Sequence, residues 1–267
     1  MPTVNEVYEY LKRIAPEEMA LETDNVGFLV GKINAIADNI LVSLDITDDV
    51  ISEASEKNAT LIIAHHPLFK TLTSVTDKDK TGQKIVRMLT EELSAICMHT
   101  NLDAAHDGVN DTLAELIGTT HTESKAEPLP DHKCTQSGEI ISYGRVGLLK
   151  NPCTVPEYLE FLKEALDANG FRYYDSGRKV HKIASVAGGG GDEWDKAIKS
   201  GCDTFITADI KYKLFLDAKD HNINLIDGGH FCTENPVIKT LANKLRSTFP
   251  DATVTTSEIH KQIQEFY

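Results

Sequence analysis

Five side chains in three separate segments of the sequence could together bind metal ions. They are His65, His66, Asp103, His230 and Glu234. A mixture of imidazole and carboxylate ligands favours Zn, Fe, Mn, Co or Ni over Ca or Mg. These donors exceed what one closed tetrahedral ion needs, whereas two ions about 3.5 to 4 Å apart with a bridging carboxylate would use all of them. If the three segments meet in the fold, we therefore expect a dinuclear centre.

His65 and His66 follow a short apolar run, residues 61–64, that is typical of a buried strand. Ligands bind at the carboxyl ends of such strands in open α/β sheets. Consecutive strand residues point to opposite faces, so both rings serve one site only where the strand breaks, or if each reaches a different ion. Pro67 provides that break. Taken alone, the pair also fits a structural alternative with one ring packed and the other solvated.

The second segment contains His99, Asn101 and Asp103, spaced two apart after the apolar run at residues 95–98. Side chains at this spacing share a face for as long as the chain stays extended. Asp103 offers oxygen ligands, and His99 is expected either to bind an ion or to orient a residue that does. Asn101 is a candidate for orienting a ligand or contacting a substrate. The alternative for Asp103 is a carboxylate that caps a loop.

In the third segment, His230 and Glu234 lie four residues apart and project from one face of a helical turn. This spacing suits joint binding of one ion. Gly228 and Gly229 let the backbone turn tightly below it. The alternative is a glutamate at a helix N-terminus, favoured by the helix dipole. Cys232 is expected to point away from the shared face and not to bind the ion.

Buried strands that alternate with helices must position these segments. A capping box formed by Thr3 and Glu6 begins a first helix, which Pro16 ends. Apolar runs without polar alternation then alternate with helical patterns, which is typical of parallel strands covered on both faces. These runs cover residues 40–46, 59–64 and 95–98. The fold class is therefore α/β, and one sheet edge would gather the candidate segments.

A second α/β unit follows the polar stretch at residues 119–138, which is the best linker candidate. Thr154 and Glu157 form another capping box. The expected strands lie near residues 140–150, 183–187, 204–207 and 223–226, followed by a helix over 236–246 and a strand over 252–256. We expect two α/β domains with mixed, largely parallel sheets flanked by helices.

Composition excludes several classes of protein. The chain has 267 residues, with 27 basic and 41 acidic side chains and a formal charge of −14, so nucleic-acid binding is disfavoured. No apolar run approaches the roughly 20 residues needed to cross a bilayer, and no secretory signal is visible. The five cysteines are odd in number and form no C-x-x-C pair, which indicates reduced thiols and a cytoplasmic protein.

An ordered set of short motifs resembles the Nif-three-like family, also called the GTP cyclohydrolase I type 2 homologues. The matching segments are Asp24-Asn25-Val26-Gly27, Val30-Gly31, Ser43-Leu44-Asp45, His65-His66-Pro67, His99-Thr100-Asn101-Leu102-Asp103, Asn110-Asp111, Thr207-Ala208-Asp209-Ile210-Lys211-Tyr212, and Gly229-His230 through Glu234. They extend over essentially the whole chain, which makes the resemblance highly specific.

The resemblance implies a dinuclear metal centre in a toroidal homohexamer. Its ligands to two divalent ions per subunit (Zn, Fe, Mn, Co or Ni) would be His65, His66, Asp103, His230 and Glu234. It also implies that the second domain is inserted in the first. We accordingly expect residues 1–125 and 225–267 to form a metal-binding α/β domain and residues 126–224 to form an inserted α/β domain.

Two positions depart from the family pattern. Thr23 stands where a tryptophan is frequent, and Lys213 stands where a histidine is frequent. Asp45 and Lys213 join His99 and Asn101 as candidates for orienting ligands or contacting substrate. The run of glycines at residues 188–191 lacks the pattern of a P-loop or a dinucleotide fingerprint, so a tight structural turn is favoured over a substrate-lining loop. The six other histidines are expected at the surface or beside ligand residues.

Two functions fit these features. The first is a metal-dependent hydrolase that acts on a nucleotide or another small molecule, with GTP suggested by the family name alone. The chain has only six arginines, and they form no evident cluster that would hold a triphosphate. The alternative is a non-catalytic metal-binding hexamer that serves as a scaffold, sensor or store. The sequence identifies no catalytic side chain beyond the metal ligands.

Overall fold

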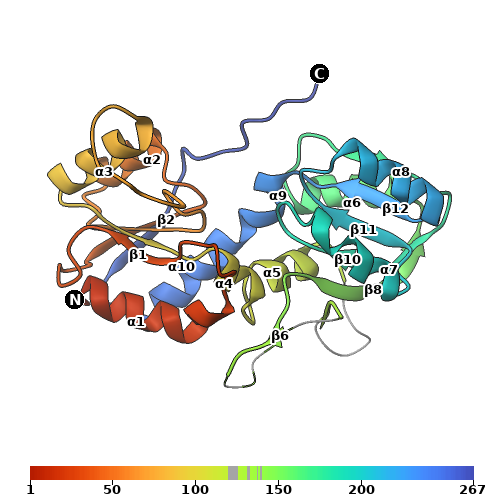
Figure 1. Cartoon of the computed structure of the whole chain (residues 1–267), viewed down its shortest axis with the longest axis horizontal. Coiled ribbons are helices and arrows are strands. Elements are labelled where there is room, and N and C mark those ends of the chain that lie inside the picture. Colours follow the sequence, from red (N-terminus) through yellow and green to blue (C-terminus); the bar gives the residue numbers. More distant parts are fainter. Residues whose placement is uncertain (120–125, 131–132, 137, 139) are drawn as a thin grey trace. The chain divides into compact units, whose positions relative to one another are not determined.

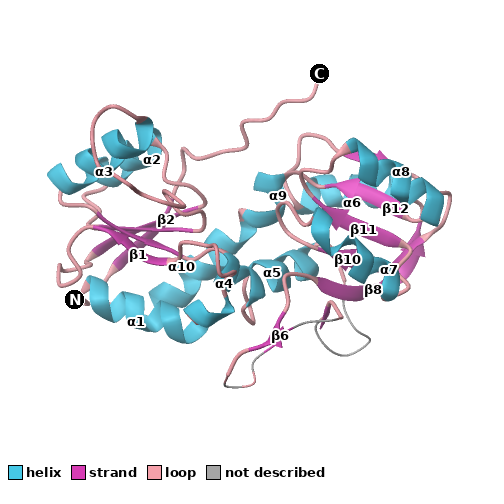
Figure 2. Cartoon of the chain, viewed as in Figure 1, coloured by secondary structure: helices cyan, strands magenta, loops and turns pink. Residues whose placement is uncertain are grey.

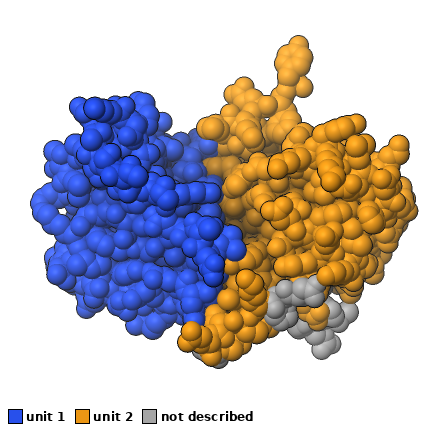
Figure 3. Space-filling model, viewed as in Figure 1, with its two compact units in different colours: residues 1–102, 238–261 blue, residues 103–237, 262–267 orange. Residues whose placement is uncertain are grey.

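The computed structural model describes residues 1–119, 126–130, 133–136, 138 and 140–267. Their contacts divide the chain into two compact units, coloured separately in Figure 3. Unit 1 contains Met1–Leu102 and Ile238–Lys261, and unit 2 contains Asp103–Val237 and Gln262–Tyr267. Two of the three limits fall inside helices α4 (Thr100–Ala104) and α10 (Pro236–Thr248), and the third falls between Lys261 and Gln262, beyond the last strand. Each unit is described separately below.

Unit 1 is built on a five-stranded sheet with the order β1-β4-β3-β2-β13 (Figure 1). The strands are β1 (Gly27–Val30), β2 (Asn39–Ser43), β3 (Leu61–Ala64), β4 (Ser94–Cys97) and β13 (Thr253–Thr256). Neighbouring strands from β13 to β4 are parallel, and β1 is an antiparallel edge strand. The helices are α1 (Val4–Ile14), α2 (Asp48–Glu56), α3 (Lys80–Thr90) and most of α10, with a 3-10 turn at Glu17–Met19.

The sequence explains why these elements form. All four residues of β3 and of β4 are buried, because helices cover both faces of the sheet (Figure 1). Leu41, Ile62 and Ala95 pack in one core with residues of α2 and α3. The expected capping box is present, since Thr3 Oγ1 accepts from Glu6 N at 3.2 Å. The sheet therefore follows the apolar runs of the sequence.

Unit 2 is built on a six-stranded mixed sheet with the order β5-β8-β10-β11-β12-β9 (Figure 2). The strands are β5 (Glu127–Pro128), β8 (Arg145–Cys153), β9 (Arg172–Tyr174), β10 (Val180–Ser185), β11 (Thr204–Thr207) and β12 (Asn224–Asp227). Strands β10, β11 and β12 are parallel, whereas β5, β8 and β9 pair antiparallel. A two-stranded sheet joins β6 (Lys133–Cys134) and β7 (Ile140–Ile141).

Helices also flank the sheet of unit 2. They are part of α4, α5 (Val109–Leu116), α6 (Val155–Ala165), α7 (Trp194–Lys199), α8 (Tyr212–His221) and α9 (His230–Glu234), with a 3-10 turn at Gly191–Glu193. Trp194 and Ala218, from α7 and α8, pack against Phe205 and Leu225 of the sheet. Both units are thus α/β with mixed sheets flanked by helices, and the predicted fold class is confirmed.

The units are delimited differently from the domains expected at 1–125 with 225–267 and at 126–224. Helix α5 contacts β8 and β10, so residues 103–125 belong to unit 2 where they are described. Residues 225–237 also belong to unit 2, because β12 is a strand of its sheet. The expected linker at 119–138 lies partly outside the described residues, and its described part contributes β5 and β6. The domain limits expected from the sequence therefore stay a prediction.

No helix in the described ranges combines the length and the apolar character needed to cross a bilayer.

The five cysteines are free thiols with very different exposure, which predicts unequal reactivity. Cys134 is exposed, whereas burial raises the pKa of Cys97 and of Cys202 to about 12. Because the thiolate is the reactive form, we expect a maleimide at pH 8 to label Cys134 first and to leave Cys97 and Cys202 unmodified until the protein unfolds. Peptide mass spectrometry over time measures this order, and labelling in denaturant is the control. Cys97 reacting as fast as Cys134 would contradict it.

Candidate metal centre

Three histidines of unit 1 gather after the adjacent parallel strands β3 and β4. The ring centroids of His65 and His66 are 4.9 Å apart, and His99 lies 5.1 Å from the first ring and 5.5 Å from the second. Each of the three offers a ring nitrogen within 4.8 Å of the others. Parallel pairing explains this cluster, because Ala64 of β3 is level with Cys97 of β4 and both strands end at the same edge.

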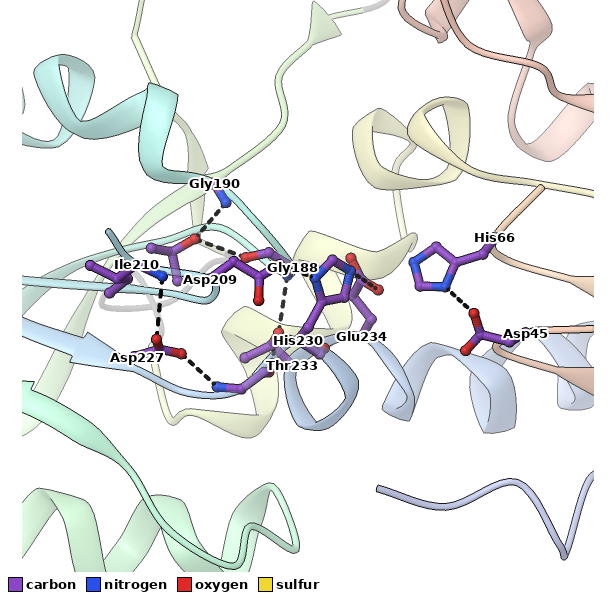
Figure 4. A network of polar contacts seen from close by, with 12 residues as sticks. Asp45, His66, Gly188, Gly190, Asp209, Ile210, Asp227, His230, Thr233 and Glu234 are labelled. Atoms are coloured by element: carbon purple, nitrogen blue, oxygen red, sulfur yellow. Dashed lines mark hydrogen bonds and ion pairs between the residues drawn. The ribbon is translucent and has the colours of Figure 1, made fainter. Parts of the chain in front are cut away.

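The Nδ1 atom of each of these rings is hydrogen-bonded to a different oxygen atom. His65 Nδ1 is 2.8 Å from the carbonyl oxygen of Met98, and His66 Nδ1 is 2.8 Å from Asp45 Oδ1 (Figure 4). His99 Nδ1 is 2.8 Å from Asp24 Oδ2. Carbonyl and carboxylate oxygens only accept hydrogen bonds, so each Nδ1 carries the hydrogen. A metal would then be bound through Nε2, which is the usual arrangement of metal-binding histidines.

Asp45, which follows β2, holds two histidines at once. Its Oδ1 accepts from His66 and its Oδ2 accepts from His260 Nε2 at 2.7 Å. Burial raises the pKa of Asp45, but the hydrogen bonds from His260 and His66 outweigh burial and hold that pKa well below its usual value. The structure thus places Asp45 against the candidate ligand His66. His260 is one of the six histidines expected at the surface or beside ligand residues, and it belongs to the same hydrogen-bond network.

Asp24 is a residue of this cluster that sequence reasoning did not select. Its carboxylate accepts from His99, from Thr100 N at 3.1 Å and from Thr100 Oγ1 at 2.5 Å. Burial raises the pKa of Asp24, but the bonds from His99 and Thr100 hold it well below its usual value. The sequence feature that could have selected Asp24 is its place in the Asp24-Asn25-Val26-Gly27 motif. Thr23, the preceding departure from the family pattern, is exposed.

Asn101 contacts the end of α1. It is fully buried, and its Nδ2 donates to the carbonyl oxygen of Ala15 at 2.8 Å. The chain stops being extended at Thr100, where α4 begins, so the two-residue spacing with His99 no longer places both side chains on one face. The side chain of Asn101 therefore ties α4 to the end of α1.

Unit 2 presents its own donors at the start of α9. The chain leaves β12 through Gly228 and Gly229, the latter with φ +80, and enters α9 at His230. His230 Nε2 is 3.1 Å from Glu234 Oε2, as expected for side chains four apart on one helical face. Asp103 offers a carboxylate oxygen within 4.8 Å of a Glu234 oxygen. His230 and Glu234 could bind one ion together, since ligands about 2.0–2.2 Å from Zn lie roughly 3 Å apart.

Asp209 holds His230 as Asp45 holds His66. His230 Nδ1 is 2.6 Å from Asp209 Oδ2 (Figure 4). The hydrogen bond that His230 donates to Glu234 is the main cause that raises the pKa of His230 to about 9, with burial opposing it and the hydrogen bond to Asp209 adding to it. Sequence reasoning did not select Asp209, although it lies in the motif at residues 207–212.

Asn110 and Asp111 make hydrogen bonds near the candidate ligand Asp103. Asn110 Nδ2 donates to the carbonyl oxygen of Asp103 at 3.1 Å, and Asn110 Oδ1 accepts from Ala187 N at 2.9 Å. Asp111 pairs with the buried guanidinium of Arg145. The motif thus fixes the backbone of one candidate ligand and the start of the glycine run.

The glycine run at residues 188–191 is a tight turn packed on the candidate ligand Glu234. Gly188 N donates to Thr233 Oγ1 at 3.0 Å, and Gly188 has φ +62. A Cβ atom on Gly188 would lie 2.0 Å from Glu234 Oε1. Only glycine therefore fits between the loop backbone and this carboxylate.

Replacing Gly188 by alanine should destabilise the protein by about 2–4 kcal/mol, because the new methyl group adds left-handed strain to a steric overlap. Gly189→Ala is the matched control, since its Cβ atom would meet its nearest neighbour, Asp209 Oδ2, at an ordinary 3.4 Å. We expect that control to stay within about 0.5 kcal/mol of the parent protein. Urea unfolding of both variants measures the difference. Equal unfolding midpoints would show that the turn tolerates a side chain at residue 188.

The remaining predicted residues lie elsewhere. Lys213, in the first turn of α8, is exposed. Cys232 is buried and its Sγ accepts from Gln262 Nε2 at 3.6 Å. His106 is exposed and pairs with Asp107. The positions of His121 and His132 fall outside the described residues, His181 lies in β10, and His221 ends α8.

Comparison with known proteins assigns the family. Residues 2–263 match the family described as Duf34/NIF3 (NGG1p interacting factor 3). The chain belongs to the Duf34/NIF3 family. A "GTP cyclohydrolase 1 type 2 homolog" of Clostridium acetobutylicum is 35% identical over 91% of this chain and 89% of the relative. The protein of the same name from Clostridium perfringens is 34% identical over 91% of each.

Solved structures of Duf34/NIF3 relatives share the whole fold. A hypothetical protein of Staphylococcus aureus superposes with a TM-score of 0.89 over 99% of both chains, at 26% sequence identity. A Bacillus cereus protein described as related to NIF3 gives a TM-score of 0.86 at 24% identity, covering 100% of this chain and 99% of that one. Within the fold of this Duf34/NIF3 protein, groups of histidine and carboxylate side chains could hold a metal ion.

Proposed function

We propose that this Duf34/NIF3 protein is a metal-dependent hydrolase with a dinuclear centre. Its ligands would be His65, His66, Asp103, His230 and Glu234. One observation carries the proposal: each of the three proposed ligand histidines has its Nδ1 atom held by an oxygen. Met98 O, Asp45 and Asp209 supply these oxygens at 2.8, 2.8 and 2.6 Å. Such partners fix the tautomer and the ring orientation that a metal ligand needs.

The chemistry of the donors also fits two divalent cations. The proposed ligands supply three imidazole nitrogens and two carboxylates. Two dications carry more positive charge than two carboxylates cancel, so the centre would attract an anionic substrate. A pair of divalent ions lowers the pKa of a water molecule and polarises the bond that this water attacks. The donor set favours Zn, Fe, Mn, Co or Ni.

The protein's own residues would orient these ligands. Asp45 and Asp209 accept the Nδ1 hydrogens of His66 and His230, so each ring would use its Nε2 atom to bind an ion. His99, held by Asp24, would lie beside the ligands of unit 1 and contact substrate. Lys213, on the exposed start of α8, would contact substrate at the position where the family resemblance makes a histidine frequent.

We propose a nucleotide or another small molecule as substrate, in line with the name "GTP cyclohydrolase 1 type 2 homolog" that the relatives carry. A homohexameric toroid in the cytoplasm is the proposed assembly. Light scattering coupled to size-exclusion chromatography would give six times the subunit mass of 29.5 kDa if this is correct.

The decisive experiment combines metal content with turnover. Protein purified without an affinity tag should contain about two ions per subunit by elemental analysis, or gain them on incubation with Zn²⁺ or Mn²⁺. The loaded protein is then screened against nucleotides and phosphoesters, with the chelator-treated protein as control. Metal-dependent turnover supports the hydrolase. Two bound ions without turnover would support a metal-binding scaffold, sensor or store, and a chain that binds no metal would refute the centre.

A further inference from the structure

The imidazole of His260 reaches the carboxylate that holds a proposed metal ligand. In unit 1, His260 Nε2 lies 2.7 Å from Asp45 Oδ2, while His66 Nδ1 lies 2.8 Å from Asp45 Oδ1. The His260 side chain is only 12% exposed, whereas the Asp45 side chain is 37% exposed. The carboxylate of Asp45 therefore receives one N–H hydrogen bond on each of its two oxygens.

The sheet explains why residues 215 positions apart meet. Strand β13 pairs in parallel with β2, with Thr256 level with Val42. Ser257 N continues the pairing by donating to the carbonyl oxygen of Val42 at 2.9 Å. Both chains then leave the sheet at the same edge, so the turn after β13 runs beside the segment that carries Asp45.

A buried carboxylate of α2 fixes this turn. Glu53 Oε2 accepts from Ser257 Oγ at 2.5 Å and Glu53 Oε1 accepts from Glu258 N at 2.9 Å. Ser257 Oγ in turn accepts from His260 N at 3.2 Å. Lys57 Nζ lies 2.8 Å from Glu53 and balances its charge. The turn is therefore anchored at Ser257 and Glu258, just before the residue that contacts Asp45.

A carboxylate that accepts hydrogen bonds from two donors rotates less freely than a carboxylate with a single donor. With a single partner, the carboxylate of Asp45 could rotate about its Cβ–Cγ bond, and the torsion at this bond is broad in proteins. The second hydrogen bond, from His260, fixes the plane of the carboxylate and therefore the direction from which His66 must donate. The ring of His66 is then held in one orientation with its Nε2 atom available to an ion.

We propose that His260 is a positioning residue for metal binding, which acts through Asp45 to orient His66. This inference rests on the proposed function, because it requires His66 to be a metal ligand. His260, in the turn after β13, would then influence the metal affinity of the centre without itself being a ligand. The loss of a partner that orients a metal ligand lowers metal affinity roughly 10–100-fold, and His260 acts one step further away.

The test is a titration of the full-length, metal-free chain with Zn²⁺ in competition with a chromophoric chelator. We expect His260→Ala to weaken the binding of one ion roughly tenfold and to leave the other ion unchanged. His260→Gln should bind nearly as tightly as the parent, because its Nε2 can donate to Asp45 in place of the ring. Lys261→Ala, an exposed neighbour in the same segment, should match the parent.

A double-mutant cycle shows whether His260 acts through Asp45 or merely supports the fold. If it acts through Asp45, His260→Ala should weaken zinc binding no further when it is added to Asp45→Ala. The ring ¹⁵N shifts of His66 in the metal-free protein provide a second readout. His260→Ala should shift them toward a tautomer mixture, and His260→Gln should not.

Three results would overturn the inference while leaving the metal centre in place. They are parental zinc affinity in His260→Ala, equal losses in His260→Ala and His260→Gln, and losses that simply add to those of Asp45→Ala. If His260→Ala does not fold, His260→Asn replaces it, since its shorter amide does not reach Asp45, and the same comparison with His260→Gln decides. A parent chain that binds no zinc would refute the proposed function itself.

Discussion

Replacing Glu234 by alanine should cost the protein roughly a hundredfold in metal affinity. Structural zinc sites with four ligands bind with about 10–16 kcal/mol, or about 3 kcal/mol per ligand, and every 1.4 kcal/mol is tenfold. Glu234 is a buried carboxylate on the same helical face as His230, so no other side chain of α9 can take its place. His66→Ala should show a loss of similar size, because His66 is also a proposed ligand.

Zinc titration against a chelator and elemental analysis after dialysis both measure this loss. Glu164→Gln, on an exposed position of α6, is the matched control for removing a carboxylate and should retain the parental metal content. Circular dichroism checks that each variant is folded. If Glu234→Ala kept two ions at the parental affinity, Glu234 would not be a ligand, and its pairing with His230 would be a structural ion pair only.

Local sequence patterns predicted the strands and the positions of the proposed ligands. Apolar runs at residues 61–64 and 95–98 became β3 and β4, and His65 and His66 follow the first of them directly. The four-residue spacing of His230 and Glu234 was also informative, because both lie in the single helix α9. These features depend only on neighbouring residues, so one sequence suffices to predict them.

The partners of the histidines could not be predicted in this way. Asp24, Asp209 and His260 reach their partners from 75, 21 and 215 residues away, so no spacing rule connects them. The two-residue spacing of His99 and Asn101 places them on one face only while the chain is extended, and α4 begins at Thr100. The role of Asn101 stays a prediction. Sequence patterns thus indicate which residues follow a strand, whereas the tertiary fold decides which carboxylate orients each ring.

The largest expected effect on stability comes from a buried ion pair of unit 2, which links α5 to the start of β8. The side chains of Arg145 and Asp111 are only 5% and 12% exposed. Arg145 Nη1 also donates to the carbonyl oxygens of Ser142 and Gly144, each at 3.0 Å. Asp111 Oδ2 accepts from Asp107 N at 2.7 Å. The guanidinium is therefore enclosed by protein, with a carboxylate as its counter-charge.

Asp111→Ala should destabilise the protein by about 3–5 kcal/mol, because it leaves a buried guanidinium without a counter-charge. Adding Arg145→Met should recover part of this loss, since the double variant no longer buries a charge. Lys32→Ala is the control, because it breaks a pair with Glu92 in which both side chains are at least 67% exposed, and it should cost under about 1 kcal/mol. Urea unfolding of the four proteins gives these values. A double variant less stable than Asp111→Ala would show that the guanidinium stabilises unit 2 through its carbonyl contacts rather than through the ion pair.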